Sequence, residues 1–288
     1  MISFHNLFLL IRLRVSIAVT FSAITAAIVY QGIPTLPMVW PVLGIFLLAC
    51  GASALNQYQE WPYDQIMERT RNRPLPSRQI NTSQALKIAS ILIISGSLIL
   101  LYRSNASTFL LGLANIIWYN GVYTFLKRKT AFAVVPGAIT GAIPVFMGWT
   151  SAGGRIEDPV VRFLAFFIFL WQMPHFWLLV MKYGHEYKAA GFPVLTAIFN
   201  PLQMKILVMG WILAASAASM MFGYFGILQI HLLVYGIVLL NLVLLLLVFF
   251  QLFIRSVINY RFIFISANIF MLLVMFALIG DHLVIKLS

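Results

Sequence analysis

The sequence predicts an all-α, polytopic membrane protein with nine transmembrane helices. The chain has 288 residues, of which 62% are hydrophobic and 9% are charged, and its mean hydropathy is +0.96. A soluble globule of this size cannot bury so much apolar surface, whereas a bilayer accepts it. The third observation is the length of the apolar runs, which approaches the roughly 20 residues that cross about 30 Å of hydrocarbon.

The apolar runs define the expected helices. They lie at residues 9–31, 36–56, 84–103, 107–126, 132–151, 159–181, 203–227, 229–254 and 262–286. The first run contains Arg12 and Arg14 and lacks a small-residue cleavage site, so we interpret it as a retained helix with a basic end at the interface. No division into several domains is indicated, and residues 1–288 are expected to form one transmembrane domain.

Charge and cysteine content exclude several other classes. The formal net charge is +12, carried by 19 Lys and Arg residues against 7 acids. The basic residues are spread between apolar stretches, so membrane topology explains them and no nucleic-acid partner is expected. The single cysteine, Cys50, lies in an apolar run, which excludes a disulfide framework and a multi-cysteine metal site.

The basic residues also predict orientation. With a cytoplasmic amino terminus, 15 of the 19 Lys and Arg residues lie at that terminus or near the loops after the second, fourth, sixth and eighth spans. The opposite side keeps Arg103, Arg155, Arg162 and Lys286. The positive-inside rule then places the carboxyl terminus outside. We expect a multi-pass protein of a prokaryotic plasma (inner) membrane.

Two long polar loops on the cytoplasmic side, at 57–83 and 182–202, are the expected location of function. Four of the seven acidic residues lie where these loops begin, at Glu60, Asp64, Glu68 and Glu186. Together with Asn56, the first three are spaced by four residues, so a continuing helix would present them on one face toward a single cation. Such oxygen ligands suit Mg²⁺, which also binds substrate phosphates.

Basic residues accompany both acidic groups. Arg69, Arg71 and Arg73 follow the first group, and their guanidinium forks suit a polyanion. Lys182 and Glu186 repeat the combination of acid and base at the end of the sixth predicted span. Two such clusters on one side of the membrane indicate a magnesium diphosphate site. A solvated loop with ion pairs between successive helical turns is the alternative for the first cluster alone.

These motifs resemble those of the UbiA superfamily of intramembrane prenyltransferases, and in particular its branch of protoheme IX farnesyltransferases. The segment 56–76, with Asn56-x3-Glu60-x3-Asp64 and the arginine run, is similar to the first motif of the family. Segments 123–144 and 171–195 resemble two further signatures. The resemblance covers roughly residues 50–200 and implies a UbiA-like bundle of nine helices.

The resemblance implies that a farnesyl group moves from farnesyl diphosphate to a vinyl group of haem b, with water supplying a hydroxyl, to form haem O and release diphosphate. It implies Mg²⁺ as cofactor, the lipid bilayer as surroundings and haem A synthase as a partner. The implied catalytic and metal-binding residues are Asn56, Glu60, Asp64 and Glu186. Those implied for the diphosphate are Arg69, Arg73, Lys127 and Lys182.

His175 is the predicted haem contact. It lies about two turns inside the sixth predicted span, beside Pro174, where a polar imidazole is expensive in hydrocarbon. An imidazole nitrogen can ligate haem iron, and Gln172 stands three residues earlier as a second haem-binding candidate. The alternative is a histidine that is hydrogen-bonded across helices for structural reasons.

The sequence departs from the family pattern within the first motif. Glu60 stands where the family usually has Asp, and Pro62 where it usually has a further Asp. The lost carboxylate is expected to weaken Mg²⁺ binding, and the proline is expected to kink the helical face that carries Asp64.

Other functions share these motifs. A UbiA-type prenyltransferase with a quinone or other aromatic acceptor is one alternative, and a weakly active or non-catalytic haem- or isoprenoid-binding relative is another. A transporter is disfavoured, because transporters bury ionisable groups near the midplane and here the deepest acid is Asp281, near the external end of its span.

Overall fold

The computed structural model describes residues 3–287, and its elements over that range are helical. The helices are α1 (Phe4–Leu10), α2 (Leu13–Gln31), α3 (Val39–Asp64), α4 (Thr82–Arg103), α5 (Ala106–Ile116), α6 (Thr124–Leu126), α7 (Val134–Ser151), α8 (Pro159–Ala189), α9 (Pro201–Tyr224), α10 (His231–Phe249) and α11 (Tyr260–Leu287). Two π-helical segments, Ile117–Tyr123 and Phe250–Ile254, and three short 3₁₀ turns, Leu36–Met38, Ala131–Ala133 and Leu195–Ala197, complete the set. Nine helical stretches of the described range are long and apolar enough to cross a membrane, which confirms the predicted fold class.

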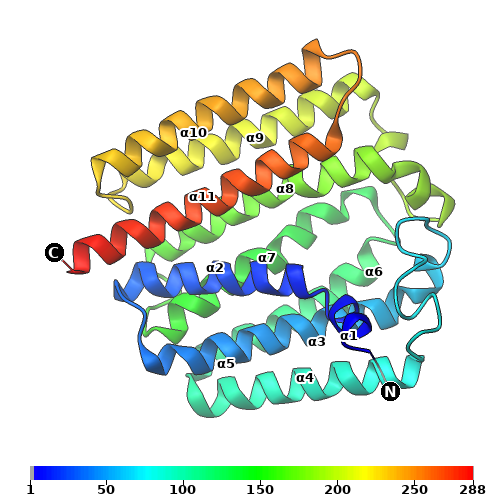
Figure 1. Ribbon diagram of the computed structural model, residues 1–288, viewed down its shortest axis with the longest axis horizontal. Coiled ribbons are helices and arrows are strands. Elements are labelled where there is room, and N and C mark those ends of the chain that lie inside the picture. Colours follow the sequence, from blue (N-terminus) through cyan, green and yellow to red (C-terminus); the bar gives the residue numbers. More distant parts are fainter. Residues whose placement is uncertain (1–2, 288) are drawn as a thin grey trace.

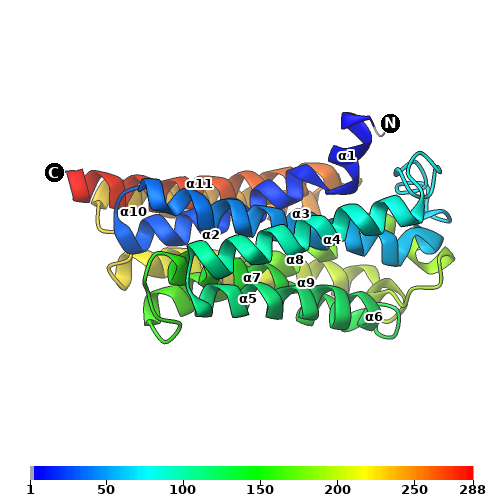
Figure 2. The same ribbon diagram turned by 90° about the horizontal axis from the view of Figure 1, so that it is seen from below.

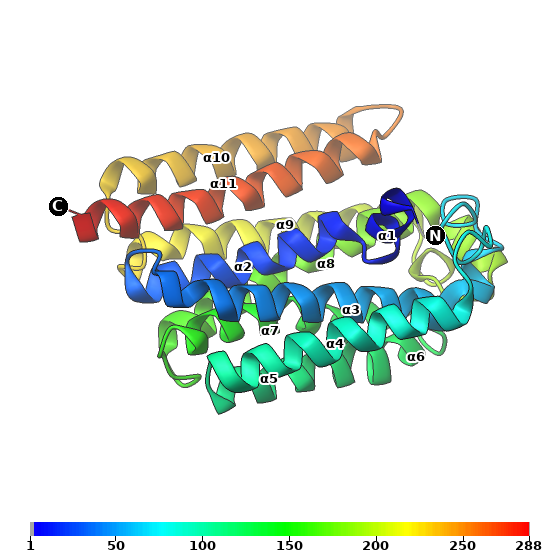
Figure 3. The same cartoon turned by 60° about the horizontal axis from the view of Figure 1, so that its bottom comes forward.

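The spanning helices lie side by side along one long axis (Figure 1). Helix α2 packs against α3, α7 and α11, and α8 packs against α7, α9 and α11, so elements distant in sequence become neighbours. In Figure 3, α10 and α11 lie together along one side of the bundle, and α4 and α5 lie along the opposite side. Gly148 permits the contact between α7 and α2, because a Cβ atom at this position would collide with the main chain of Ala23. The resulting core is built mostly from aliphatic and phenylalanine side chains.

Both long loops and α1 lie at one end of the bundle, and the last described residues of α11 lie at the other (Figures 1 and 2). We call the first of these the loop end. The loops are shorter than the sequence predicts, at 65–81 and 190–200, because α3 continues to Asp64 and α8 to Ala189. Helix α8 has 31 residues, or about 46 Å of helix, which exceeds the hydrocarbon thickness. Its end can therefore carry polar residues beyond the apolar layer.

The first predicted span, 9–31, differs from the structure because it is broken at Arg12. This residue adopts a left-handed conformation with φ 46° and separates α1 from α2. The side chain of Gln57 donates hydrogen bonds of 2.7 and 2.9 Å to the carbonyl oxygens of Leu9 and Leu10. A side chain of α3 thus satisfies carbonyl groups that the break frees, which makes the kinked start of the chain part of the packed bundle.

Asp281 has a structural role in this arrangement. Its side chain is fully buried, and Oδ1 accepts hydrogen bonds from the main-chain N–H groups of Gln229 and Ile230 at 2.9 and 2.7 Å. These groups precede α10, so the carboxylate of α11 fixes the start of the neighbouring helix and complements its dipole.

Replacing Asp281 with alanine should destabilise the protein by about 2 kcal/mol, because two buried main-chain donors lose a charged acceptor. Thermal denaturation of the purified protein in detergent measures the effect. Asp281→Asn keeps an oxygen acceptor and should lose less stability. Equal stability of the alanine variant and the unmodified protein would contradict this role.

Candidate active site

The end of α3 supplies the first acidic group. Asn56, Glu60 and Asp64 are 1%, 5% and 1% exposed, so all three point into the bundle from one helical face, as their spacing predicts. Glu68 does not join them, because α3 ends at Asp64 and Glu68 is exposed in the loop beyond. The helix continues past the apolar run and thereby carries these polar groups to the loop end.

Each of the two carboxylates on α3 has a basic partner from another segment. Lys127, at the end of α6, forms an ion pair with Glu60. Arg73, in the loop after α3, forms an ion pair of 2.7 Å between Nη1 and Oδ2 of Asp64. Burial lowers the pKa of the Lys127 ammonium, while the neighbouring Glu60 carboxylate opposes that shift. Acidic and basic side chains of different segments are therefore held together by pairing within the chain.

The second acidic group meets the first through Arg69. The main-chain N–H of Arg69 donates a 2.9 Å hydrogen bond to Oε2 of Glu186, and its Nη2 donates one of 2.9 Å to the hydroxyl of Tyr187. The guanidinium also lies over the rings of Tyr183 and Tyr187, 5.3 and 5.7 Å from their centroids. The loop after α3 is thus attached to the end of α8, which joins the two clusters that are far apart in sequence.

The donor atoms in this region fit Mg²⁺ bound together with a diphosphate. Over the described residues, no three His, Cys, Asp or Glu side chains form a group that could hold a metal by themselves. Mg²⁺ does not need such a cage, since one or two carboxylates plus phosphate oxygens suffice. Asn56 donates a 2.9 Å hydrogen bond to Thr124, whereas its buried Oδ1 lacks a hydrogen-bond partner. That oxygen and the buried Glu60 and Asp64 carboxylates form a suitable hard donor set.

Pro62 lies away from this donor set. Its side chain is exposed, whereas Glu60 and Asp64, two residues to either side, are buried. Helix α3 continues through the proline to Asp64. The carboxylate that the family pattern would have at position 62 therefore belongs to a different face of the helix from the buried acids.

Sequence reasoning missed Arg12 as a site residue. Its Nη1 donates a 3.3 Å hydrogen bond to the hydroxyl of Tyr119, its buried Nε lacks a hydrogen-bond partner, and it interacts electrostatically with Glu60 and Asp64. Tyr119 lies in the π-helical segment after α5 and stacks on Tyr123 at 5.8 Å. An arginine within an apolar run was a usable signal, but the positive-inside rule already accounted for it.

His175 and Gln172 contact different neighbours of α8. The imidazole of His175 lies 4.5 Å from the Phe264 ring of α11, centroid to centroid, and its buried Nδ1 lacks a hydrogen-bond partner. Gln172 instead packs on Gly141 of α7, where a Cβ atom would overlap the amide. The structure therefore separates the two predicted haem-binding residues; the Nδ1 of His175 lacks a partner, and Asn268 of α11 also interacts with its imidazole.

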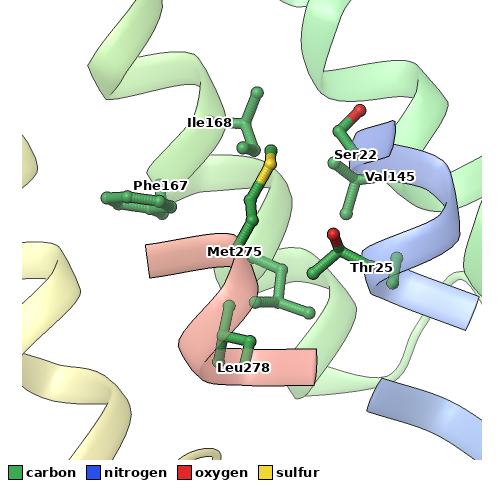
Figure 4. A pocket seen from close by; sticks show the side chains of 9 residues that line it. Ser22, Thr25, Val145, Phe167, Ile168, Met275 and Leu278 are labelled. Atoms are coloured by element: carbon green, nitrogen blue, oxygen red, sulfur yellow. The ribbon is translucent and has the colours of Figure 1, made fainter. Parts of the chain in front are cut away.

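A small internal cavity lies between α2, α7, α8 and α11 (Figure 4). Its volume of about 20 Å³ holds roughly one water molecule. The hydroxyls of Ser22 and Thr25 donate to the carbonyls of Val19 and Phe21 in their own helix. This cavity is a packing gap and does not form part of the candidate site.

A membrane bundle with facing acid and base clusters at one end is the arrangement of an intramembrane prenyltransferase. Residues 16–279 match the UbiA prenyltransferase family, and the chain belongs to that family. Curated protoheme IX farnesyltransferases are among its similar relatives. That of Geobacter sulfurreducens is 40% identical over 189 residues, covering 65% of this chain and 70% of the relative. That of Sorangium cellulosum is 38% identical over 203 residues, covering 70% and 72%.

Solved structures share the fold at low sequence identity. A structure of digeranylgeranylglyceryl phosphate synthase aligns with a TM-score of 0.74 and 17% identity, covering 98% of this chain and 99% of that chain. A UbiA homologue from Archaeoglobus fulgidus bound to DMAPP and Mg²⁺ aligns with a TM-score of 0.70 and 13% identity, covering 96% and 99%. These likenesses support the nine-helix UbiA-like bundle.

Proposed function

We propose that this protein transfers a farnesyl group from farnesyl diphosphate to a vinyl group of haem b and so forms haem O. The observation that carries the proposal is the joining of both acid–base clusters at one end of the bundle, above a histidine with an unpaired nitrogen on the same helix, α8. The names of the similar relatives support the same reaction.

Arg69, Arg73 and Lys127 hold the diphosphate in this proposal. The Arg73 and Lys127 cations already lie beside Asp64 and Glu60, so small side-chain movements can exchange carboxylate oxygens for phosphate oxygens, and the Arg69 guanidinium lies at the Tyr187 hydroxyl of the same region. Lys182 was predicted to bind the diphosphate as well, and in the structure it lies between α8 and α11 with Arg261.

Asn56, Glu60, Asp64 and Glu186 are the residues that would hold Mg²⁺. When bound, the ion stabilises the charge that grows on the departing diphosphate. The carbon–oxygen electron pair of the donor leaves with the diphosphate, and the stacked faces of Tyr119 and Tyr123 can stabilise the allylic cation by cation–π attraction.

The acceptor step needs no covalent bond between the protein and either substrate. The vinyl group of haem b forms a carbon–carbon bond with the farnesyl cation, and the positive charge moves to the carbon next to the porphyrin. Water adds there and releases a proton. His175 would position the acceptor through its free imidazole nitrogen, which can ligate iron.

The distribution of basic residues also supports an orientation in the membrane. We place the loop end and the amino terminus on the cytoplasmic side of a prokaryotic inner membrane, and the carboxyl terminus outside. We treat 1–288 as one prenyltransferase domain whose loops at the loop end close the donor site. An association with haem A synthase would hand the product to the next enzyme.

Incubation of the purified protein with farnesyl diphosphate, Mg²⁺ and haem b tests the function. We expect a product with the mass of haem O and release of diphosphate, and no product when EDTA removes Mg²⁺. Farnesylation of a quinone in place of haem b, or binding of both compounds without turnover, would reject the proposal.

Replacing His175 with alanine should weaken haem binding at least about tenfold, or 1.4 kcal/mol, and change its absorption spectrum, because an iron ligand is lost. Binding of farnesyl diphosphate should change by less than about twofold. His185→Ala is the matched control, since His185 is an exposed histidine of the same helix. Equal weakening of both substrates would identify His175 as a structural residue.

A further inference from the structure

A groove runs between α8 and α11 at the loop end. It has a volume of about 400 Å³ and is lined by Leu178, Leu179, Lys182, Tyr183, Tyr260, Arg261, Phe264 and Ile265. This volume falls within the range of roughly 300–1,000 Å³ that is typical of small-molecule sites. Leucine, isoleucine and phenylalanine side chains form its body, and two cations and two phenols lie nearer the loop end.

The groove continues the two parts of the site already described. On α8, His175, Leu179, Lys182 and Glu186 recur at intervals of three or four residues and therefore share one helical face, and Leu178 lies one turn before Lys182. Seven residues separate His175 from Lys182, which is about 10 Å of helix, and Glu186 lies one turn further on. The ring of Phe264 lines the groove and also contacts His175. The groove therefore extends from the Phe264 ring, which contacts His175, to Lys182 and Arg261 nearer the loop end.

The two cations of the groove lack acidic partners in the described chain. Lys182 and Arg261 form no ion pair there, whereas Lys127 and Arg73 pair with Glu60 and Asp64. Lys182 instead places its Nζ 4.8 Å from the centroid of the Tyr183 ring. Two unpaired cations beside an apolar groove are complementary to a ligand that has an apolar body and two negative groups at one edge.

We propose that Lys182 and Arg261 bind the two carboxylates of the tetrapyrrole acceptor, whose apolar macrocycle occupies the groove and whose iron faces His175. The inference rests on the proposed function, because it assumes a haem acceptor. It assigns Lys182 to the acceptor instead of the diphosphate, and it adds Arg261, which the motifs do not indicate.

The membrane itself favours this orientation. Carboxylates are expensive within hydrocarbon, so an acceptor that enters from the bilayer keeps its carboxylate edge near the membrane surface. At this groove the surface is marked by Lys182 and Arg261, while His175 lies deeper along α8. A lysine and an arginine can each form a charge-assisted hydrogen bond with one carboxylate, and the neighbouring phenols can donate as well.

The test compares haem b with its dimethyl ester, which has the same macrocycle and iron but no charged edge. Dissociation constants are measured by absorption for the full chain in phosphatidylcholine nanodiscs. The unmodified protein should bind haem b at least about tenfold more tightly than the ester. The double variant Lys182→Met/Arg261→Met should bind haem b only as tightly as the unmodified protein binds the ester. Its affinity for the ester, and its affinity for farnesyl diphosphate with Mg²⁺, should equal those of the unmodified protein.

Lys188→Met/Arg255→Met is the matched control, because it removes the same charge outside the groove and Lys188 lies on the opposite face of α8. It should keep the preference for haem b. The ester affinity and the thermal midpoint of the groove variant report whether its groove is still folded, so a loss confined to haem b supports the proposal.

Four results would overturn it. Equal affinities of the unmodified protein for haem b and the ester would show that the carboxylates are not recognised. Loss of farnesyl diphosphate binding in Lys182→Met would return this lysine to the donor site. Competition between phosphatidylglycerol and haem b, abolished in the double variant, would make the groove a lipid headgroup site.

Haem O formed equally by the unmodified protein and the double variant would reject this inference alone, whereas no haem O from either would reject the proposed function.

Discussion

Replacing Asp64 with alanine should reduce farnesyl transfer at least about 1,000-fold, which corresponds to about 4 kcal/mol of transition-state stabilisation. Asp64 is 1% exposed, forms an ion pair with Arg73, and lies on the same helical face as Glu60. Its loss would remove a proposed donor for Mg²⁺ and leave the Arg73 guanidinium without its carboxylate. The measurement is the rate of haem O formation at saturating Mg²⁺ by protein recovered from membranes.

Glu68→Ala is the matched control for this experiment. Glu68 follows in the same segment but is exposed beyond the end of α3, so its removal should change the rate by less than about twofold. Asp64→Ala should still insert into the membrane, because the hydrogen bond that Thr70 donates to residue 64 uses the main-chain oxygen. Normal turnover by Asp64→Ala would remove Asp64 from the metal site.

Replacing Arg12 with methionine should lower kcat/KM for farnesyl diphosphate at least about 100-fold, or about 2.7 kcal/mol. The guanidinium has an unpaired buried Nε, and it contacts Tyr119 beside the donor site. We expect it to meet a phosphate oxygen when the donor binds. Methionine has a Cβ atom like arginine, so the left-handed conformation at this position is equally strained in both proteins.

Arg14→Met provides the comparison, since Arg14 is exposed two residues further along α2 and carries the same charge. Its kcat/KM should stay within about twofold of the unmodified value. Arg12→Lys keeps a cation and should recover part of the lost activity. If the two methionine variants behave alike, Arg12 contributes only to membrane orientation.

The structure shows why the first acidic motif could be recognised from the sequence. Its residues recur every four positions, and a regular helix converts that spacing into one face without help from other segments. The same reasoning fails at Glu68, because α3 ends four residues earlier. Where a helix ends depends on the loop contacts that follow, and here Thr70 and Arg73 hold the chain against Asp64.

Arg12 and the groove illustrate what local sequence does not contain. The break at Arg12 is stabilised by Gln57, which is 45 residues away, and the groove needs α8 and α11 to pack side by side. The sequence groups Lys182 with the basic residues predicted for the diphosphate. The structure places it in a groove with Arg261 of α11. His175 and Gln172 are three residues apart, yet one contacts α11 and the other α7.

The sequence by itself determined the membrane class, the number of spans and the residues of the two charged motifs, because hydropathy and helical spacing are properties of consecutive residues. Only the tertiary structure decided which polar groups meet: the Lys127 ammonium with Glu60, the Arg69 main-chain N–H with Glu186, and the Arg12 guanidinium with the Tyr119 hydroxyl. In a bundle whose helices are apolar on most sides, periodicity does not mark which faces pack together. That choice follows from the fit of small and large side chains between helices far apart in the chain.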